Sequence, residues 1–142
     1  MASKLSERLA LVAIKDPISV DNVTVATAYV DTKLFSKLLF GFSISGAADV
    51  TAAVRLYKAS DTNGTGSASF ATAAIATTTV TTRQHVIPVD IDNLDPAKPY
   101  VKGEIQMADS SNTVLGCIMG FGESRYSPVE SFDLSTVTVV SY

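Results

Sequence analysis

The sequence predicts an all-β fold, an antiparallel β-sandwich of the jelly-roll type, on three observations. Alanine, serine, valine and threonine make up 64 of the 142 residues, and β-branched residues favour strands because they pack well on a pleated surface. Seven or eight short runs of strand-forming residues recur at intervals of about ten residues. Turn-forming residues separate these runs, and no long stretch has the apolar period of a helix.

The clearest strand alternation lies between residues 34 and 45. One face would carry Leu34, Ser36, Leu38, Phe40, Phe42 and Ile44, and the other Phe35, Lys37, Leu39, Gly41, Ser43 and Ser45. Since the first set is almost entirely apolar, we expect it to face the core. A strand over residues 20–31 is expected to precede it, with a break at Asp31 and Thr32.

The middle of the chain predicts one further strand and a long turn. Residues 50–58 alternate, which turns Val54 and Leu56 inward and Arg55 and Tyr57 outward. Residues 59–67 form the strongest loop signal, because the pair Asn63-Gly64 readily takes positive φ. Residues 68–82 are rich in alanine and threonine, and an edge strand, a loop and a short helix all stay open there.

Three more strands are expected in the C-terminal half. Residues 83–92 place His85, Ile87, Val89 and Ile91 on one face, and Pro88 on the opposite face indicates an edge strand or a bulge. After a loop over residues 92–99, residues 100–107 alternate between apolar and polar side chains. Residues 114–121 are apolar on both faces, with Leu115, Cys117, Met119 and Phe121 opposite Val114, Gly116, Ile118 and Gly120. Cover on both sides is therefore expected for that strand.

One domain is expected to span residues 1–142, with possible arms at residues 1–19 and 124–142. Both ends carry apolar residues without evident strand partners, so an arm that reaches a neighbouring subunit and an edge strand of the same sandwich both stay open. Leu5, Leu9 and Val12 are spaced as in a helix, which leaves a helix over residues 3–14 beside a strand or an extended arm.

Charge and hydropathy exclude several classes of protein. The net charge of −3, with a pI near 5.0 and scattered arginines, argues against nucleic acid as a partner. The longest apolar run near the start, residues 9–14, is too short for a signal peptide or a membrane span. We therefore expect a soluble protein that is made in the cytoplasm.

Neither the single histidine nor the single cysteine has the neighbours that catalysis needs. His85 lies on the apolar side of its strand, and with one Cys and no second His a catalytic metal would lack its usual three ligands. We expect a core or interface histidine with one hydrogen bond. Cys117 lies among apolar residues, with nothing nearby to lower its pKa, which indicates a small buried hydrophobe.

Asp90, Asp92 and Asp95 form the densest acidic group of the chain. Counted from Asp90, the glycine and glutamate that an EF-hand requires are missing, so an irregular calcium site and a solvated turn stay open. An enzyme would need Asp90, Asp92 or Glu104 as an acid and base pair, and no pattern places these residues in a cleft. We assign no catalytic, cofactor-binding or metal-binding residue, and expect no enzymatic activity.

The glycine-containing motifs also favour structural roles. The loop from Asn63 to Gly66 lacks the lysine of a phosphate-binding loop. Gly116, Gly120 and Gly122 fit a close backbone approach within a sheet better than a dinucleotide fingerprint, which needs a strand-to-helix turn. Two matches to the glycosylation acceptor, at Asn22 and Asn63, are of the kind that arises by chance in a chain rich in Ser and Thr.

The order of segments resembles the small capsid cement, or decoration, proteins of tailed bacteriophages. The resemblance covers roughly residues 20–121 and follows the overall scheme: a Val/Thr strand, the alternation over 34–46, the strand 54–61 ending in Ser-Asp, a Gly-rich turn, an Ala/Thr-rich segment, and the run 94–104. No single motif in it is specific.

This resemblance implies a jelly-roll-like sandwich bound to the outside of a phage head in the virion, made in the host cytoplasm. It further implies a dimer or trimer that clamps neighbouring major capsid subunits, and it transfers no catalytic residues. From the residues themselves we expect no cofactor, no nucleic acid and no membrane as partner. Two alternatives stay open: a phage tail or head–tail joining protein, which shares parts of the same scheme, and a carbohydrate-binding or adhesin module. The latter normally presents exposed aromatic residues, and this chain has no Trp and few outward tyrosines (Tyr57, Tyr100 and Tyr126).

Overall fold

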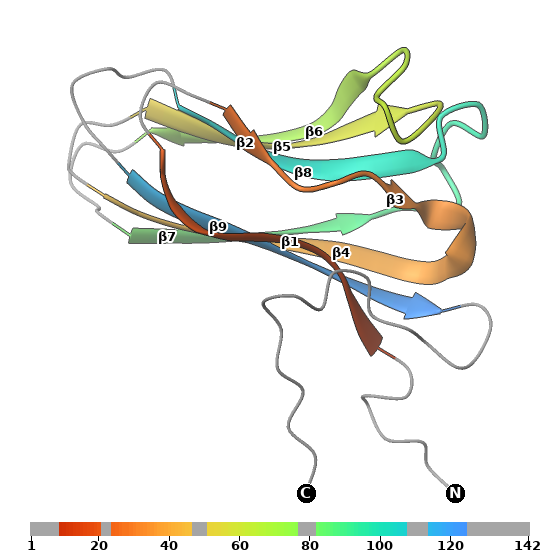
Figure 1. The fold of residues 1–142 in the computed structure, drawn as a ribbon, viewed down its shortest axis with the longest axis horizontal. Coiled ribbons are helices and arrows are strands. Elements are labelled where there is room, and N and C mark those ends of the chain that lie inside the picture. Colours follow the sequence, from red (N-terminus) through yellow and green to blue (C-terminus); the bar gives the residue numbers. More distant parts are fainter. Residues whose placement is uncertain (1–8, 21–23, 47–50, 77–81, 108–113, 125–142) are drawn as a thin grey trace, which may run out of the picture.

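The computed structural model describes residues 9–20, 24–46, 51–76, 82–107 and 114–124, which form two antiparallel sheets packed face to face (Figure 1). Sheet A has the order β1 (Leu9–Val20), β9 (Val114–Ser124), β4 (Phe35–Gly46) and β7 (Thr82–Val89). Sheet B has the order β2 (Thr24–Ala26), β8 (Tyr100–Met107), β5 (Thr51–Ala59) and β6 (Ala68–Ala76), and β3 (Val30–Asp31) also pairs with β8. A 3-10 turn, η1 (Thr32–Leu34), leads into β4.

The strands pair in nested fashion, first with last. Within sheet A, β1 pairs with β9 and β4 with β7; within sheet B, β2 pairs with β8 and β5 with β6. This wrapping of one long hairpin into two sheets is the double Greek key of a jelly roll. The fold class predicted from the sequence is confirmed.

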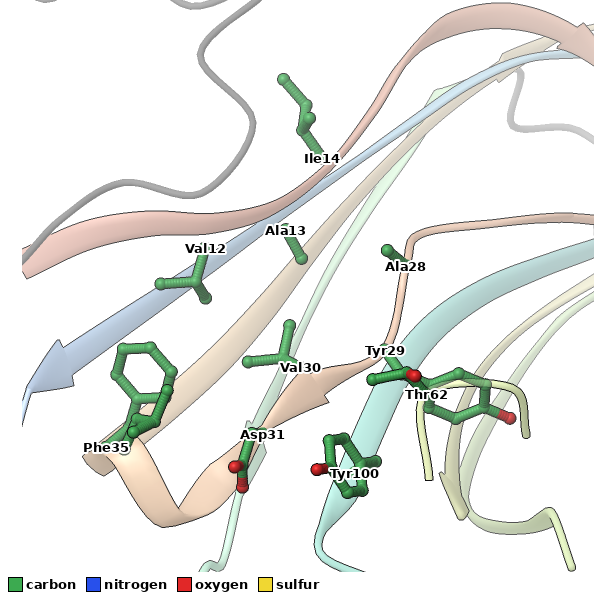
Figure 2. Close-up of a pocket in the computed structure, with 11 residues that line it drawn as sticks. Val12, Ala13, Ile14, Ala28, Tyr29, Val30, Asp31, Phe35, Thr62 and Tyr100 are labelled. Atoms are coloured by element: carbon green, nitrogen blue, oxygen red, sulfur yellow. The ribbon is translucent and has the colours of Figure 1, made fainter. Parts of the chain in front are cut away.

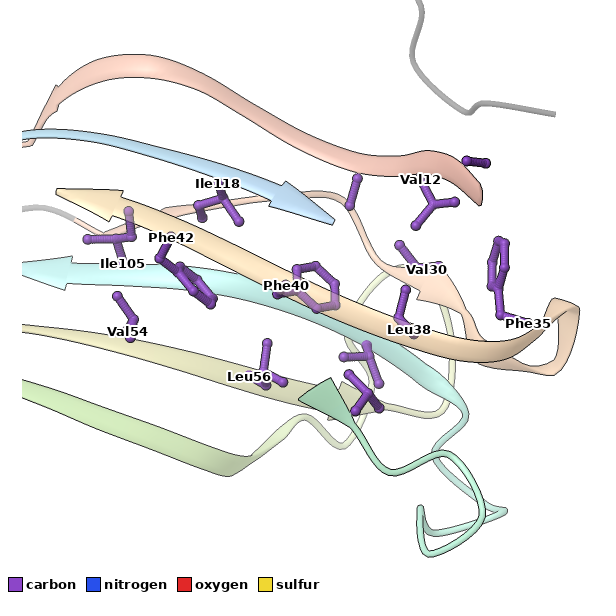
Figure 3. Close-up of a cluster of buried hydrophobic side chains, with 14 of the residues drawn as sticks. Val12, Val30, Phe35, Leu38, Phe40, Phe42, Val54, Leu56, Ile105 and Ile118 are labelled. Atoms are coloured by element: carbon purple, nitrogen blue, oxygen red, sulfur yellow. The ribbon is translucent and has the colours of Figure 1, made fainter. Parts of the chain in front are cut away.

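The core lies between the two sheets and is built from the alternation that the sequence predicted (Figure 3). Leu38, Phe40, Phe42 and Ile44 of β4 are all buried, and Phe40 has no exposed surface. Opposite them, Val54 and Leu56 of β5 and Val101 and Ile105 of β8 are fully buried. Each such side chain contributes about 1.5–3 kcal/mol by leaving water.

The predicted alternation is wrong at its beginning. Leu34, expected in the core, is 43% exposed, whereas Phe35, expected outside, is 2% exposed. The 3-10 turn over Thr32–Leu34 delivers the chain into β4 at a different phase. A register shift between Phe35 and Lys37 then restores the predicted phase for the rest of the strand.

Glycines on the inner faces leave room for large side chains of neighbouring strands and of the facing sheet. A Cβ atom on Gly122 would lie 2.6 Å from Cδ1 of Phe35, and one on Gly120 would lie 3.0 Å from Cβ of Ala13. On sheet B, a Cβ atom on Gly103 would lie 2.9 Å from Cδ1 of Phe40. The close approach predicted within the sheet at Gly120 and Gly122 is thus made by side chains of neighbouring strands, and not by backbone.

The N-terminal segment is a strand, so the helical alternative is wrong for residues 9–14. Leu9–Val20 pairs along β9 at the edge of sheet A, and it is an edge strand of its own sandwich over this range. The expectations for residues 1–8 and 125–142, and for the turns at 47–49 and 109–112, lie outside the described residues. No helix in the described part of the chain is long and apolar enough to cross a membrane.

A single strand was expected over residues 20–31, but Val20 belongs to β1, and residues 24–31 hold two short pieces, β2 and β3. Residues 21–23 lie outside the described residues. At the gap between β2 and β3, the backbone N–H of Thr27 donates to the carbonyl of Gly103 (3.0 Å), and the Thr27 hydroxyl accepts from the N–H of Gly103 (3.1 Å). A side chain therefore replaces a backbone acceptor, and the ladder is interrupted at this point. The ambiguous residues 68–76 form an edge strand of sheet B, and β7, with Pro88 exposed, is an edge strand of sheet A.

Candidate interaction surface on sheet A

The outer face of sheet A carries two rows of residues without a polar side chain. Residues directly opposite each other on paired strands share a face. One row runs across all four strands through Leu11, Phe121, Leu39 and Pro88, and the next through Ile14, Met119, Gly41 and Val86. We call these eight residues the apolar rows.

The apolar rows are open to solvent at several positions. Val86 is 67% exposed and Met119 is 40% exposed. Gly41 leaves a hollow between these two side chains, because a Cβ atom there would meet only the carbonyl oxygen of Met119, at 3.7 Å. The face therefore combines projecting apolar groups with a gap into which another side chain can insert.

Polar and charged residues border the apolar rows at both ends. On one side Lys37 lies opposite Glu123, with 3.8 Å between Nζ and Oε2. On the other side Cys117, Ser43 and Gln84 form a mixed row, followed by Leu115, which is 56% exposed, opposite Ser45. An apolar centre within a polar rim is the usual composition of a protein interface.

The outer face of sheet B is of the opposite character. Arg55 lies opposite Glu104, and Tyr57 lies opposite Lys102. The Lys102 ammonium forms an ion pair with Glu104 (3.7 Å) and lies 5.1 Å from the ring centroid of Tyr29 and 5.6 Å from that of Tyr57. Charged and aromatic side chains therefore make up this face, in contrast to the apolar rows of sheet A.

A cavity of about 440 Å³ opens between the edges of the two sheets (Figure 2). Its walls are mainly apolar and come from β1, from the segment between β2 and β4, from the loop that carries Thr62, and from Tyr100 at the start of β8. Figure 2 shows the rings of Tyr29 and Tyr100 and the Asp31 carboxylate on one side of it. The Asp31 carboxylate already accepts a hydrogen bond from the N–H of Lys33 (3.0 Å).

The structure places His85 and Cys117 on opposite sides of sheet A. His85 points toward the inner face, as predicted, but its Nε2 is buried without a hydrogen-bond partner among the described residues. The expected single hydrogen bond is therefore not found at this atom. Cys117 lies on the outer face and is half-buried, which corrects the expectation of a buried side chain.

The acidic group of the 90–99 loop serves the loop itself. The Asp90 carboxylate accepts from the side-chain amide of Asn93, and the Asp95 carboxylate accepts from the N–H of Ala97. Glu104 lies on β8, on the outer face of sheet B. In the described part of the chain, no three His, Cys, Asp or Glu residues are placed to hold a metal ion.

The loop between β5 and β6 is organised by one carboxylate, that of Asp61. It accepts from the hydroxyl of Thr65 (2.6 Å) and from the N–H groups of Thr65 (3.0 Å) and Asn63 (2.9 Å). These hydrogen bonds, first of all the one from the Thr65 hydroxyl, lower the pKa of Asp61 below its ordinary value of 3.8. Gly64 and Gly66 have positive φ, so the predicted turn at Asn63-Gly64 is confirmed.

Comparisons with known proteins assign no family to this chain. No protein-family model and no curated protein matches the sequence. Similar solved structures include those of infectious bursal disease virus, of the Gx strain (14% identity, TM-score 0.49) and the Gt strain (17% identity, TM-score 0.46). Each match covers 85% of this chain and 33% of the other, so the chain spans about a third of the length of the chains it matches. Similarity of this degree supports no conclusion about shared function.

Sequence reasoning found part of the candidate surface. It placed Leu115, Cys117, Met119 and Phe121 on one face of a strand and expected both faces to be covered. The rows across four strands depend on the register of β1, β4 and β7 against β9. No pattern within one strand reveals that register.

Proposed function

We propose that the chain is a viral structural protein of the capsid-decoration class. It would bind the outside of a phage head as a homo-oligomer and clamp neighbouring major capsid subunits. The observation that carries the proposal is the pair of apolar rows on the outer face of sheet A. A protein that worked alone in water would gain nothing from this surface.

Exposed apolar patches with a polar rim mark surfaces that another protein covers. Here the patch lies on a hydrogen-bonded sheet, whose backbone is fixed by pairing along β9 and β4. Such a face is pre-organised, so covering it costs little conformational entropy. These properties support a role in assembly. The order of segments over residues 20–121, which resembles that of the capsid cement proteins, supports capsid decoration as the kind of assembly.

An oligomer clamps a lattice by multivalent attachment. Each copy would make a modest contact with one capsid subunit, and the contacts of linked copies add without a further loss of translational freedom. The overall affinity of linked contacts can exceed that of a single one by about 10²–10⁴. A chain that cannot self-associate would therefore bind the same lattice much more weakly.

The test uses empty shells of the major capsid protein that is encoded in the same genome. We expect the purified chain to sediment with the shells in a saturable manner and to raise the temperature at which they dissociate. Electron microscopy should place it on the outer surface of the head. A chain that stays in the supernatant, or that binds only tails or the head–tail joint, contradicts the proposal.

One observation favours a second candidate, a carbohydrate-binding module. The cavity beside β1 combines two tyrosine rings, Tyr29 and Tyr100, with the Asp31 carboxylate, and aromatic faces with a nearby acceptor suit a sugar ring. A glycan array separates the two candidates. Binding that is lost in Tyr100→Ala would support the module, and the absence of any bound glycan would dispose of it.

A further inference from the structure

We infer that the outer face of sheet A packs against the same face of a second copy of this chain, related by a two-fold axis. The inference rests on the proposed assembly function and deepens it by naming what covers the apolar rows. In a two-fold interface one patch is used twice, so the patch must be complementary to itself.

The charges of the face allow this pairing. Lys37 and Glu123 lie opposite each other at one end of the face and carry opposite charges. Asp16 stands at the edge of the sheet, in the bulge of β1 opposite Cys117. The eight residues of the apolar rows contribute no charge. Two copies can therefore meet without bringing uncompensated like charges into the centre. The outer face of sheet B, with Arg55, Lys102 and Glu104, would have to desolvate charges to do the same.

The size of the face also fits a dimer. Four strands about 4.8 Å apart and four rows about 6.8 Å apart, from Phe121 to Leu115, make a face of roughly 500 Å². Two such faces bury about 1,000 Å² in total, which reaches the lower bound for a specific interface. Sheets pack at a distance of about 10 Å with interleaved side chains, and the hollow at Gly41 is a place for a side chain of the facing sheet.

The experiment uses the full chain and its single cysteine. Cys117 borders the apolar rows and is the only thiol in the sequence, so the rate of its alkylation reports cover on this face. Sedimentation equilibrium and alkylation by iodoacetamide are measured on the same samples over a range of protein concentrations. We expect the mass to rise from 14.9 kDa to twice that value, and the alkylation rate to fall over the same concentrations.

The decisive variant is Val86→Glu, which adds a charge at the β7 end of the second apolar row, at a position that is 67% exposed. We expect it to weaken the dimer by at least about 100-fold and to restore fast alkylation. Ser69→Glu adds the same charge to an exposed position opposite Tyr57, on the other sheet, and should leave both readouts unchanged. Leu115→Glu is a second variant for the same face, and circular dichroism confirms the fold of each.

Three results would overturn the inference. A monomer with a fast-reacting thiol at every concentration means that nothing covers the face. A monomer whose thiol is protected at every concentration means that another part of the same chain covers it. A dimer that survives Val86→Glu and Leu115→Glu associates through another surface. If the wild-type chain dimerises as described but does not bind shells, the capsid function is wrong and the two-fold dimer stands. If the chain binds shells as a monomer, the two-fold dimer is wrong and the capsid function stands.

Discussion

Replacing Gly103 with alanine adds a single methyl group at the point where the two sheets touch. Its Cβ atom would lie 2.9 Å from Cδ1 of Phe40, 3.1 Å from Cγ2 of Ile118 and 3.2 Å from Cζ of Phe42. All three neighbours belong to sheet A and are at most 2% exposed. They have no free space to move into, so the sheets must separate or the rings must leave their preferred rotamers.

The magnitude follows from two opposing terms. Overpacking a core by a methyl group costs about 1–3 kcal/mol, whereas alanine gains about 0.5–1 kcal/mol over glycine because it restricts the unfolded chain. We expect a net loss of about 1.5 kcal/mol in the free energy of unfolding. For a chain of this length the midpoint of thermal unfolding should fall by about 5 °C.

Gly41→Ala is the matched control, because it makes the same substitution on the solvent side of sheet A. There the new methyl group would meet only the carbonyl oxygen of Met119 at 3.7 Å, so we expect no loss and a gain of up to about 1 kcal/mol. Both variants are unfolded by heat and by urea at the same low protein concentration, at which the chain is monomeric. Equal shifts in the two variants, or a more stable Gly103→Ala, would refute the packing described here.

Three further predictions concern single polar groups. Thr27→Val removes the hydroxyl that accepts from the buried N–H of Gly103 and should cost about 1–3 kcal/mol in urea unfolding, whereas Thr27→Ser should cost less; equal losses would contradict the role of the hydroxyl. Thr65→Val should raise the pKa of Asp61 toward 3.8 in a carbon-detected NMR titration, because the Thr65 hydroxyl is the main cause of its depression. The folded-state pKa of Asp61 is lowered, so the stability that its hydrogen bonds contribute is complete above the unfolded-state pKa and is lost as the pH falls through the folded-state pKa. An unchanged titration midpoint of Asp61 in Thr65→Val would contradict the role of the Thr65 hydroxyl. Lys37→Ala breaks an ion pair whose lysine side chain is 81% exposed. At low protein concentration we expect the free energy of unfolding to change by less than about 0.5 kcal/mol; a larger loss would mean that the pair is better shielded from water than its exposure indicates.

The core of this fold could be predicted from the sequence wherever a strand alternates without interruption. Phe40 and Phe42 repeat with period two in a long run, and the same holds for Val54 and Leu56. In such runs the burial of one face determines the phase of every residue. The glycines of β9 were also informative, since a small residue on the inner face indicates a close neighbour.

The prediction failed where a local hydrogen bond or turn changes the phase. Leu34 and Phe35 exchange places because a 3-10 turn precedes β4, and the strand expected over residues 20–31 is interrupted where Thr27 pairs with Gly103. The 3-10 turn is a feature of backbone geometry, and the Thr27–Gly103 pairing joins residues that are far apart in the sequence. An apolar pattern encodes neither. The same applies to the candidate surface, since its rows are completed by Leu11, Leu39 and Val86 from three strands other than β9.

The central claim is that the chain acts in assembly through the outer face of sheet A. Hydroxyl-radical footprinting of the dilute chain and of chain bound to capsid shells tests it most directly, with the outer face of sheet B as an internal reference. We expect Leu115, Met119 and Phe121 to be oxidised several-fold more slowly on the shell than in the dilute chain. Equal oxidation rates at these three residues in the two states would contradict the claim.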